Sequence, residues 1–179
     1  MSPRLFPRVR SQAGYTLVEL IIALAISGFL MVALTSVVLT SVRAAATATN
    51  RVEASSEIRS FQSFAADDFA RSGVPDGGGC GTAATPCTTE PILLVGTQVS
   101  NSTQPAASTV QVTYTWDGSS FVDRQIGGGE AIHAATDVTA FSWYVDSSAA
   151  RPTVVVSVTV TVGAYSESQT FRFYPRVNP

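Results

Sequence analysis

Lysine is absent from this chain of 179 residues, histidine occurs once, and charged residues make up only 13% of the sequence. A phosphate-binding P-loop requires a lysine after its glycines, so Gly127-Gly128-Gly129-Glu130 is predicted to be a flexible turn. One histidine cannot supply the two-histidine zinc motif, and we expect His133 to be an ordinary loop residue. We identify no catalytic, cofactor-binding or metal-binding set and therefore expect a protein that is not an enzyme.

Acidic residues outnumber basic ones once the first 14 residues are set aside. Three of the 11 arginines lie at positions 4, 8 and 10, which leaves eight arginines against 13 acidic residues from Tyr15 onward, a formal charge of −5. Binding to a nucleic-acid backbone requires clustered cations that neutralise phosphates. We therefore expect no nucleic-acid partner.

Residues 20–42 form an uncharged run of 23 residues, LIIALAISGFLMVALTSVVLTSV. At about 1.5 Å per residue, a helix of this length spans about 35 Å, enough to cross a hydrocarbon core of about 30 Å. Because the three arginines precede the run, the positive-inside rule predicts a cytoplasmic N-terminus and a single pass across the membrane. A secretory signal peptide cut near residues 44–46 and a plain membrane anchor are the competing interpretations, although a signal peptide has a shorter apolar region.

The residues at the start of this run are Ala13-Gly14-Tyr15-Thr16-Leu17-Val18-Glu19-Leu20. They resemble the class III signal of type IV pilins and type II secretion pseudopilins, in which a basic leader, a glycine, an aromatic residue, a glutamate and an apolar run follow in this order. The family usually has phenylalanine where this chain has Tyr15, and tyrosine keeps the aromatic ring. The resemblance covers residues up to about 45.

The resemblance implies how the chain is processed and where it acts. Prepilin peptidase would cut after Gly14 and methylate the new N-terminal residue, Tyr15. The other implied partners are further pilin or pseudopilin subunits and the bacterial inner membrane. The remaining domain would then lie in the periplasm or in an extracellular pilus.

Glu19 is a carboxylate at the start of a membrane-length helix, where a charge is costly. After cleavage the α-amine of Tyr15 would lie four residues back on the same helical face, so one interpretation is a charge pair within the subunit. The other is that Glu19 accepts the α-amine of a neighbouring subunit and sets the stagger between subunits. The family resemblance favours the second interpretation and gives Glu19 a role in assembly.

Cys80 and Cys87 are the only cysteines and lie seven residues apart. The predicted topology places them outside the cytoplasmic membrane, where disulfides form and persist. A zinc site would need two further ligands, and the single histidine is remote in sequence. We therefore predict a disulfide rather than two free thiols.

The helix is expected to continue beyond the membrane, because residues 44–71 contain no proline or glycine. Ile58, Phe61, Ala65 and Phe69 follow helical spacing and predict an apolar stripe that packs on a sheet, with Phe64 beside it. Ser72-Gly73-Val74-Pro75 ends this helix. The adjacent Asp67 and Asp68 resemble a metal pair only superficially, since neighbours on a helix point about 100° apart.

Beyond the helix the apolar residues alternate with polar ones, which is typical of strands. Asp117-Gly118 and Gly163-Ala164 are the predicted tight turns between them. We expect one antiparallel sheet of five to six strands, and hence an α+β, pilin-like fold in which a long N-terminal helix packs on this sheet. The expected strands cover residues 92–99, 110–116, 120–126, 139–145, 154–162 and 168–174.

These observations divide the chain into five segments. They are a leader at 1–14, a transmembrane or filament-core helix at 15–43, an amphipathic helix half at 44–72, a Gly/Pro-rich loop at 73–91 and an antiparallel sheet domain at 92–179. Residues 64–73 also resemble a short stretch of J-type pseudopilins and W-type minor pilins. A minor subunit is therefore the leading hypothesis, and a major pilin, or a membrane-anchored periplasmic binding domain that does not polymerise, is the alternative.

Overall fold

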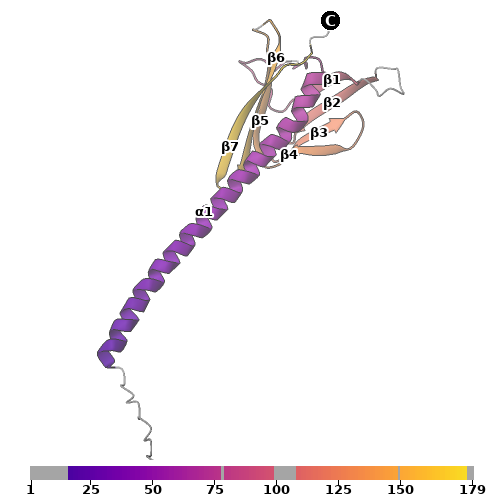
Figure 1. Cartoon of the computed structure of the whole chain (residues 1–179). Coiled ribbons are helices and arrows are strands. Elements are labelled where there is room, and N and C mark those ends of the chain that lie inside the picture. Colours follow the sequence, from indigo (N-terminus) through magenta and orange to yellow (C-terminus); the bar gives the residue numbers. More distant parts are fainter. Residues whose placement is uncertain (1–15, 78, 99–107, 149, 177–179) are drawn as a thin grey trace, which may run out of the picture. The chain divides into compact units, whose positions relative to one another are not determined.

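The computed structural model describes residues 16–77, 79–98, 108–148 and 150–176. The chain forms two compact units, Met1–Ala45 and Ala46–Pro179. One helix, α1, has residues in both units (Figure 1). The elements are α1 (Leu17–Arg71), β1 (Ile92–Gln98), β2 (Ser108–Trp116), β3 (Val122–Ile126), β4 (Ala131–Ala135), β5 (Val138–Asp146), β6 (Thr153–Val162) and β7 (Tyr165–Phe173).

The predicted α+β architecture is confirmed, but the strands form two sheets instead of one. A four-stranded sheet has the order β1-β2-β3-β4 and a three-stranded sheet the order β5-β6-β7, and every pairing is antiparallel. The expected count of five to six strands omitted β4. Its sequence, AIHAA, shows no apolar–polar alternation, and its formation depends on pairing with β3.

The amphipathic stripe of α1 is confirmed in the second unit. Ala54, Ile58, Phe61, Ala65 and Phe69 are its buried residues, spaced three or four positions apart so that they share one face. No glycine or proline interrupts this part of the helix, and α1 ends at Arg71, before Ser72-Gly73. Figure 1 shows the strands beside this part of α1, and the five side chains belong to the same core as residues of both sheets.

Phe61 lies at the centre of the core and contacts strands of both sheets. Its ring centroid is 5.7 Å from Tyr114 of β2, 6.0 Å from Phe141 of β5 and 5.8 Å from Phe171 of β7. About two turns further along α1, Phe69 stacks on Phe173 at 4.4 Å. Burying a side chain of this size stabilises the fold by about 1.5–3 kcal/mol, so the aromatic stripe is a main link between the helix and the two sheets.

The strand β6 shows how alternation orients the three-stranded sheet. Val154, Val156, Val158 and Val160 are buried against the core, while Ser157, Thr159 and Thr161 between and after them are only half-buried. Those hydroxyls contact partners on β7, with Thr159 donating to Ser168 at 3.0 Å and Ser157 lying 2.9 Å from Thr170. The predicted turn at Gly163-Ala164 is present, and Gly163 has a φ of +58°, which favours glycine.

The end of α1 is held close to the edge of β1. Ser72 and Gly96 form a β-bridge, and the N–H of Gly73 donates to the carbonyl of Val95 at 2.9 Å. A Cβ at Gly96 would lie 2.7 Å from the carbonyl oxygen of Arg71, so only glycine permits this approach. The N–H of Arg176 donates to the carbonyl of Ser72, which brings the C-terminal segment to the same place.

A charged cluster joins α1 to the four-stranded sheet. The guanidinium of Arg124 on β3 donates twice to Asp68, from Nε at 2.6 Å and from Nη2 at 2.8 Å, and the hydroxyl of Tyr114 donates to the same carboxylate at 2.5 Å. The Arg124 and Asp68 side chains are only 14% and 9% exposed. The Arg124 guanidinium also lies over the ring of Phe64. All three polar groups therefore depend on one another for partners away from water.

Replacing Asp68 by alanine is expected to lower the free energy of unfolding by about 3–5 kcal/mol, because it leaves Arg124 charged and unpaired in a buried setting. Asp67→Ala is the matched control, since Asp67 pairs with Arg71 at the surface with both side chains about 60% exposed, and its loss should cost less than about 1 kcal/mol. Urea titration of the full chain in detergent micelles measures both. Equal losses in the two variants would contradict the proposed role of the cluster.

Alkaline pH should weaken the fold through Tyr114. Burial, followed by the Asp68 carboxylate, raises the pKa of Tyr114 above its ordinary value of 10.0. Because the native state keeps the proton to higher pH than the unfolded chain, this stabilisation is complete below about pH 10 and is lost as pH rises further, by up to about 1.4 kcal/mol per pH unit. Unfolding titrations between about pH 9 and about pH 12 should show this slope in the wild type and a shallower one in Tyr114→Phe.

Candidate functional site

The described part of the N-terminal junction begins at Thr16, which caps α1. Its backbone N–H and its hydroxyl both donate to Oε2 of Glu19, at 2.8 and 3.0 Å, and the N–H of Glu19 donates back to Thr16 Oγ1 at 3.3 Å. This reciprocal pattern is a capping box, which satisfies N–H groups that the first turn of a helix leaves without partners. Glu19 therefore has partners inside its own subunit, on the residue three positions before it.

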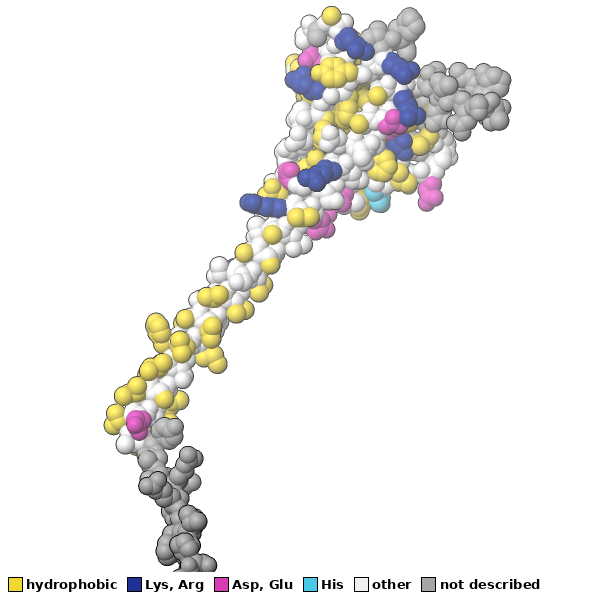
Figure 2. Space-filling model, viewed as in Figure 1, with side chains coloured by type: hydrophobic (Ala, Val, Ile, Leu, Met, Phe, Trp, Pro, Cys, Tyr) yellow, Lys and Arg dark blue, Asp and Glu magenta, His cyan; other side chains and the backbone are white. Residues whose placement is uncertain are grey.

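The apolar half of α1 has no protein covering it in the first unit. Most large hydrophobic side chains from Leu17 to Val42 are more than half exposed, among them Phe29 at 78%. Figure 2 shows hydrophobic side chains along the face of this segment turned to the viewer. Among the described residues, α1 is the one helix long and apolar enough to cross a membrane. An apolar surface of this extent indicates a contact with lipid or with other protein.

Three of the hydroxyl groups within this apolar segment bond to carbonyl groups of their own helix. Thr35 donates to the carbonyl of Met31 at 2.8 Å, Ser36 to that of Ala33 at 2.7 Å and Thr40 to that of Ser36 at 2.8 Å. Polar side chains that bond to the preceding turn do not need water. The segment therefore remains compatible with an apolar environment in spite of its serines and threonines.

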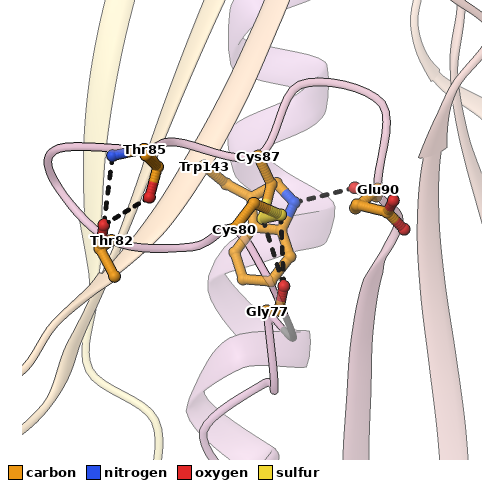
Figure 3. The surroundings of a disulfide bond; sticks show 7 residues. All are labelled: Gly77, Cys80, Thr82, Thr85, Cys87, Glu90 and Trp143. Carbon is orange, nitrogen blue, oxygen red and sulfur yellow. Dashed lines mark hydrogen bonds between the residues drawn. A yellow bond between two sulfur atoms is a disulfide. The ribbon is translucent and has the colours of Figure 1, made fainter.

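The predicted disulfide between Cys80 and Cys87 is present in the second unit, with the two Cα atoms 5.1 Å apart. Figure 3 shows it beside Trp143 of β5, whose indole N–H donates to the carbonyl of Glu90 at 2.9 Å. Cys87 is 1% exposed and Trp143 is fully buried. The bond thus lies at the margin of the core, between the loop that follows α1 and the edge of the three-stranded sheet.

The remaining polar residues singled out from the sequence do not converge on a site. Asp67 and Asp68 point to different partners, Arg71 and Arg124 respectively. The prediction that His133 is a loop residue is wrong, because His133 lies on β4, where its Nδ1 is 2.6 Å from Asp123 and its ring stacks on Phe121. Strand β4 had no pattern from which this position could be inferred. The glycines at 127–129 form the expected turn, between β3 and β4.

A small cavity lies beside the charged cluster. Its volume is about 90 Å³, and Asp68, Arg71 and Arg124 are among its lining residues. Ligand sites usually have volumes of about 300–1,000 Å³, and the charges here are already paired with one another. Within the described ranges, no group of three or more histidine, cysteine or acidic residues is placed to hold a metal ion.

Comparison with known proteins identifies the N-terminal segment. Residues 9–35 match the family model described as the prokaryotic N-terminal methylation motif. The chain carries the signature of type IV pilins and pseudopilins. No curated protein and no solved structure matches the chain. The match ends at residue 35, so it concerns the N-terminal segment and the capped, apolar start of α1. It says nothing about the sheet domain.

The methylation motif indicates what the N-terminal part of the chain does. It implies processing by prepilin peptidase and assembly with other pilin subunits, and it is the motif of structural subunits rather than of an enzyme family. Together with the exposed apolar half of α1, it indicates that the chain is anchored in a membrane. Gly14 and Tyr15, the predicted processing residues, lie outside the described residues, so their roles remain predictions.

Sequence analysis missed two contacts, and only one of them had a signal in the sequence. The Thr16-Leu-Val-Glu19 spacing matches the Ser/Thr-x-x-Glu pattern of a capping box, so Thr16 was available as a local signal. The partner of Asp68 was not, because Arg124 lies 56 residues away and is brought near only by the packing of β3 under α1.

Proposed function

We propose that this protein is a minor pilin or pseudopilin, cut after Gly14 by prepilin peptidase, held in the bacterial inner membrane by residues 15–43 and assembled into a type IV pilus or a type II secretion pseudopilus. The observation that carries the proposal is the match of residues 9–35 to the methylation motif on a helix whose apolar side chains are exposed. In this proposal the sheet domain lies on the periplasmic or extracellular side.

The exposed apolar helix supports assembly as well as anchoring. A side chain such as Phe29 can be covered by lipid before assembly and by the helices of other subunits afterwards, and both environments are apolar. In the sheet domain, the charges around the small cavity pair with one another, as in the contact of Arg124 with Asp68. The support for a structural role comes from the methylation motif and the exposed apolar half of α1.

The minor subunit is favoured over a major pilin by the position of the disulfide and by the end of α1. Cys80 and Cys87 lie shortly after the end of α1 at Arg71. Major pilins, by contrast, tend to carry their disulfide near the C-terminus. Residues 64–73 resemble the corresponding stretch of J-type pseudopilins and W-type minor pilins. A membrane-anchored domain that does not polymerise is the second candidate.

Mass spectrometry of the mature N-terminus tests the processing step. We expect the purified membrane form to begin at N-methylated Tyr15, and a Gly14→Ala variant produced in the same cells to retain residues 1–14 because cleavage needs the glycine. A mature start near residues 44–48, or an intact Met1 in the wild type, would contradict the proposal and favour a signal peptide or a plain anchor.

The role of Glu19 in assembly can be separated from its role in the capping box. Glu19→Gln keeps an oxygen that can accept from Thr16 but removes the charge, and Glu19→Ala removes both. If Glu19 pairs with the α-amine of a neighbouring subunit, both variants should be cleaved normally and should enter filaments at least about tenfold less well, since an unpaired charge in apolar surroundings costs on the order of 2–3 kcal/mol.

Glu53→Gln is the matched control for this experiment, because Glu53 is an exposed glutamate on the second half of the same helix. It should be incorporated like the wild type in a pull-down of sheared filaments or pseudopili. Normal incorporation of Glu19→Gln beside failure of Glu19→Ala would show that the cap, and not the charge, is what assembly requires.

A further inference from the structure

The outer edge of β5 is covered by the disulfide loop, residues 80–87. In the three-stranded sheet β5 pairs with β6 on one side only. On its other side the N–H of Cys87 donates to the carbonyl of Trp143 at 2.8 Å, and the N–H of Trp143 donates to the carbonyl of Cys87 at 2.9 Å. The N–H of Val145 donates to the carbonyl of Gly81 at 2.9 Å. The loop therefore adds a short strand-like cover to the sheet.

The two loop residues that pair with β5, Gly81 and Cys87, lie at the disulfide. Gly81 follows Cys80 directly, and Cys87 is the second half of the disulfide. Between them, residues 82–86 are exposed and bond within the loop, where Gly81 N–H donates to Thr85 O at 2.9 Å and the hydroxyls of Thr82 and Thr85 are 2.7 Å apart. The cover thus gains no apolar anchor from its middle. Its ends are joined by the bond between the two sulfur atoms and contact β5 through backbone hydrogen bonds.

Trp143 lies directly under this cover. It is fully buried, and its indole nitrogen reaches past the disulfide to the carbonyl of Glu90, as Figure 3 shows. The backbone of the same residue exchanges both hydrogen bonds with Cys87. Removing the loop would leave the β5 backbone groups at Trp143 and Val145 without these partners and would open a path to the indole.

We propose that the Cys80–Cys87 disulfide is a redox-controlled latch that closes the outer edge of β5 over Trp143. With the bond formed, Gly81 and Cys87 are held in register with β5. With the bond reduced, the two ends of the loop separate, because its exposed middle contributes no apolar burial that would keep them together. The rest of the β5-β6-β7 sheet stays folded in both states.

The latch closes by thiol–disulfide exchange with a protein or small molecule that carries a disulfide. A thiolate of one cysteine attacks the oxidant's disulfide, and the second thiolate then displaces the oxidant's sulfur to form the Cys80–Cys87 bond. The two thiols lose two protons and two electrons, and the oxidant leaves as a dithiol. Opening is the reverse step, in which a dithiol reductant is oxidised. Cys87 is 1% exposed whereas Cys80 is half-buried, so an incoming thiolate reaches the sulfur of Cys80 first.

An uncovered sheet edge is a template for pairing with other chains. Once the disulfide has formed, the loop blocks such pairing at the edge of β5. The latch itself does not depend on the proposed function, but the moment at which the disulfide forms does. If the sheet domain crosses the membrane as proposed, closure follows its arrival in an oxidising compartment.

Hydrogen exchange of the full chain in detergent micelles tests the latch. We expect reduction of the wild type, or the double substitution Cys80→Ser/Cys87→Ser, to speed exchange of the Trp143 and Val145 amides at least about tenfold. The amides of Val156 and Val158 on β6 should exchange as in the oxidised protein. Reoxidation of the wild type should restore protection, whereas the serine variant should not respond to oxidant.

The matched control is Thr82→Val/Thr85→Val, which removes the hydroxyl contact inside the loop and keeps the disulfide. Its Trp143 and Val145 amides should stay protected. Unchanged protection of these amides in the folded serine variant would overturn the latch. A rise in exchange of equal size on β6 would overturn it as well, because the disulfide would then act on the stability of the whole domain.

Discussion

Phe61 is the contact on which the second unit depends, because it touches Tyr114, Phe141 and Phe171, which lie on β2, β5 and β7 of two separate sheets. Each sheet has an apolar face that must be covered to exclude water, and the apolar stripe of α1 covers both faces. The helix in turn gains its burial only from these sheets, since isolated helices are marginal in water. Helix and sheets therefore stabilise one another through a small set of aromatic rings.

Polar contacts then fix where the helix lies on this apolar surface. Hydrophobic packing is not directional, so aromatic contacts alone allow small shifts. The bidentate bond from Arg124 to Asp68 and the hydroxyl bond from Tyr114 permit one arrangement of α1 on β2 and β3, because each group would otherwise lack a partner away from water. At the end of the helix, Gly96 lets the chain pass close to β1.

In the first unit, the apolar side chains of α1 are exposed instead of packed on a sheet. Its large hydrophobic side chains up to Val42 are exposed, and the hydroxyls of Thr35, Ser36 and Thr40 bond to their own helix. Glu19 is held by Thr16 at the cap. Such a segment is suited to an environment that lacks water. The methylation motif at residues 9–35 indicates that this environment is a membrane. The proposed assembly of subunits would provide a second apolar environment.

The sequence by itself determined the features that depend on neighbours along the chain. The apolar run, the stripe from Ile58 to Phe69, the disulfide over seven residues and most strand positions all follow from local composition and spacing, and the methylation motif is also local. The pairing of Asp68 with Arg124, the strand β4 with His133, the split into two sheets and the cover that the disulfide loop forms on β5 were decided by the tertiary structure. The ion pair and the cover on β5 join residues far apart in sequence, and such contacts leave no periodic signal in either partner. Strand β4 pairs with its neighbour β3, but its sequence AIHAA has no apolar–polar alternation that would reveal it.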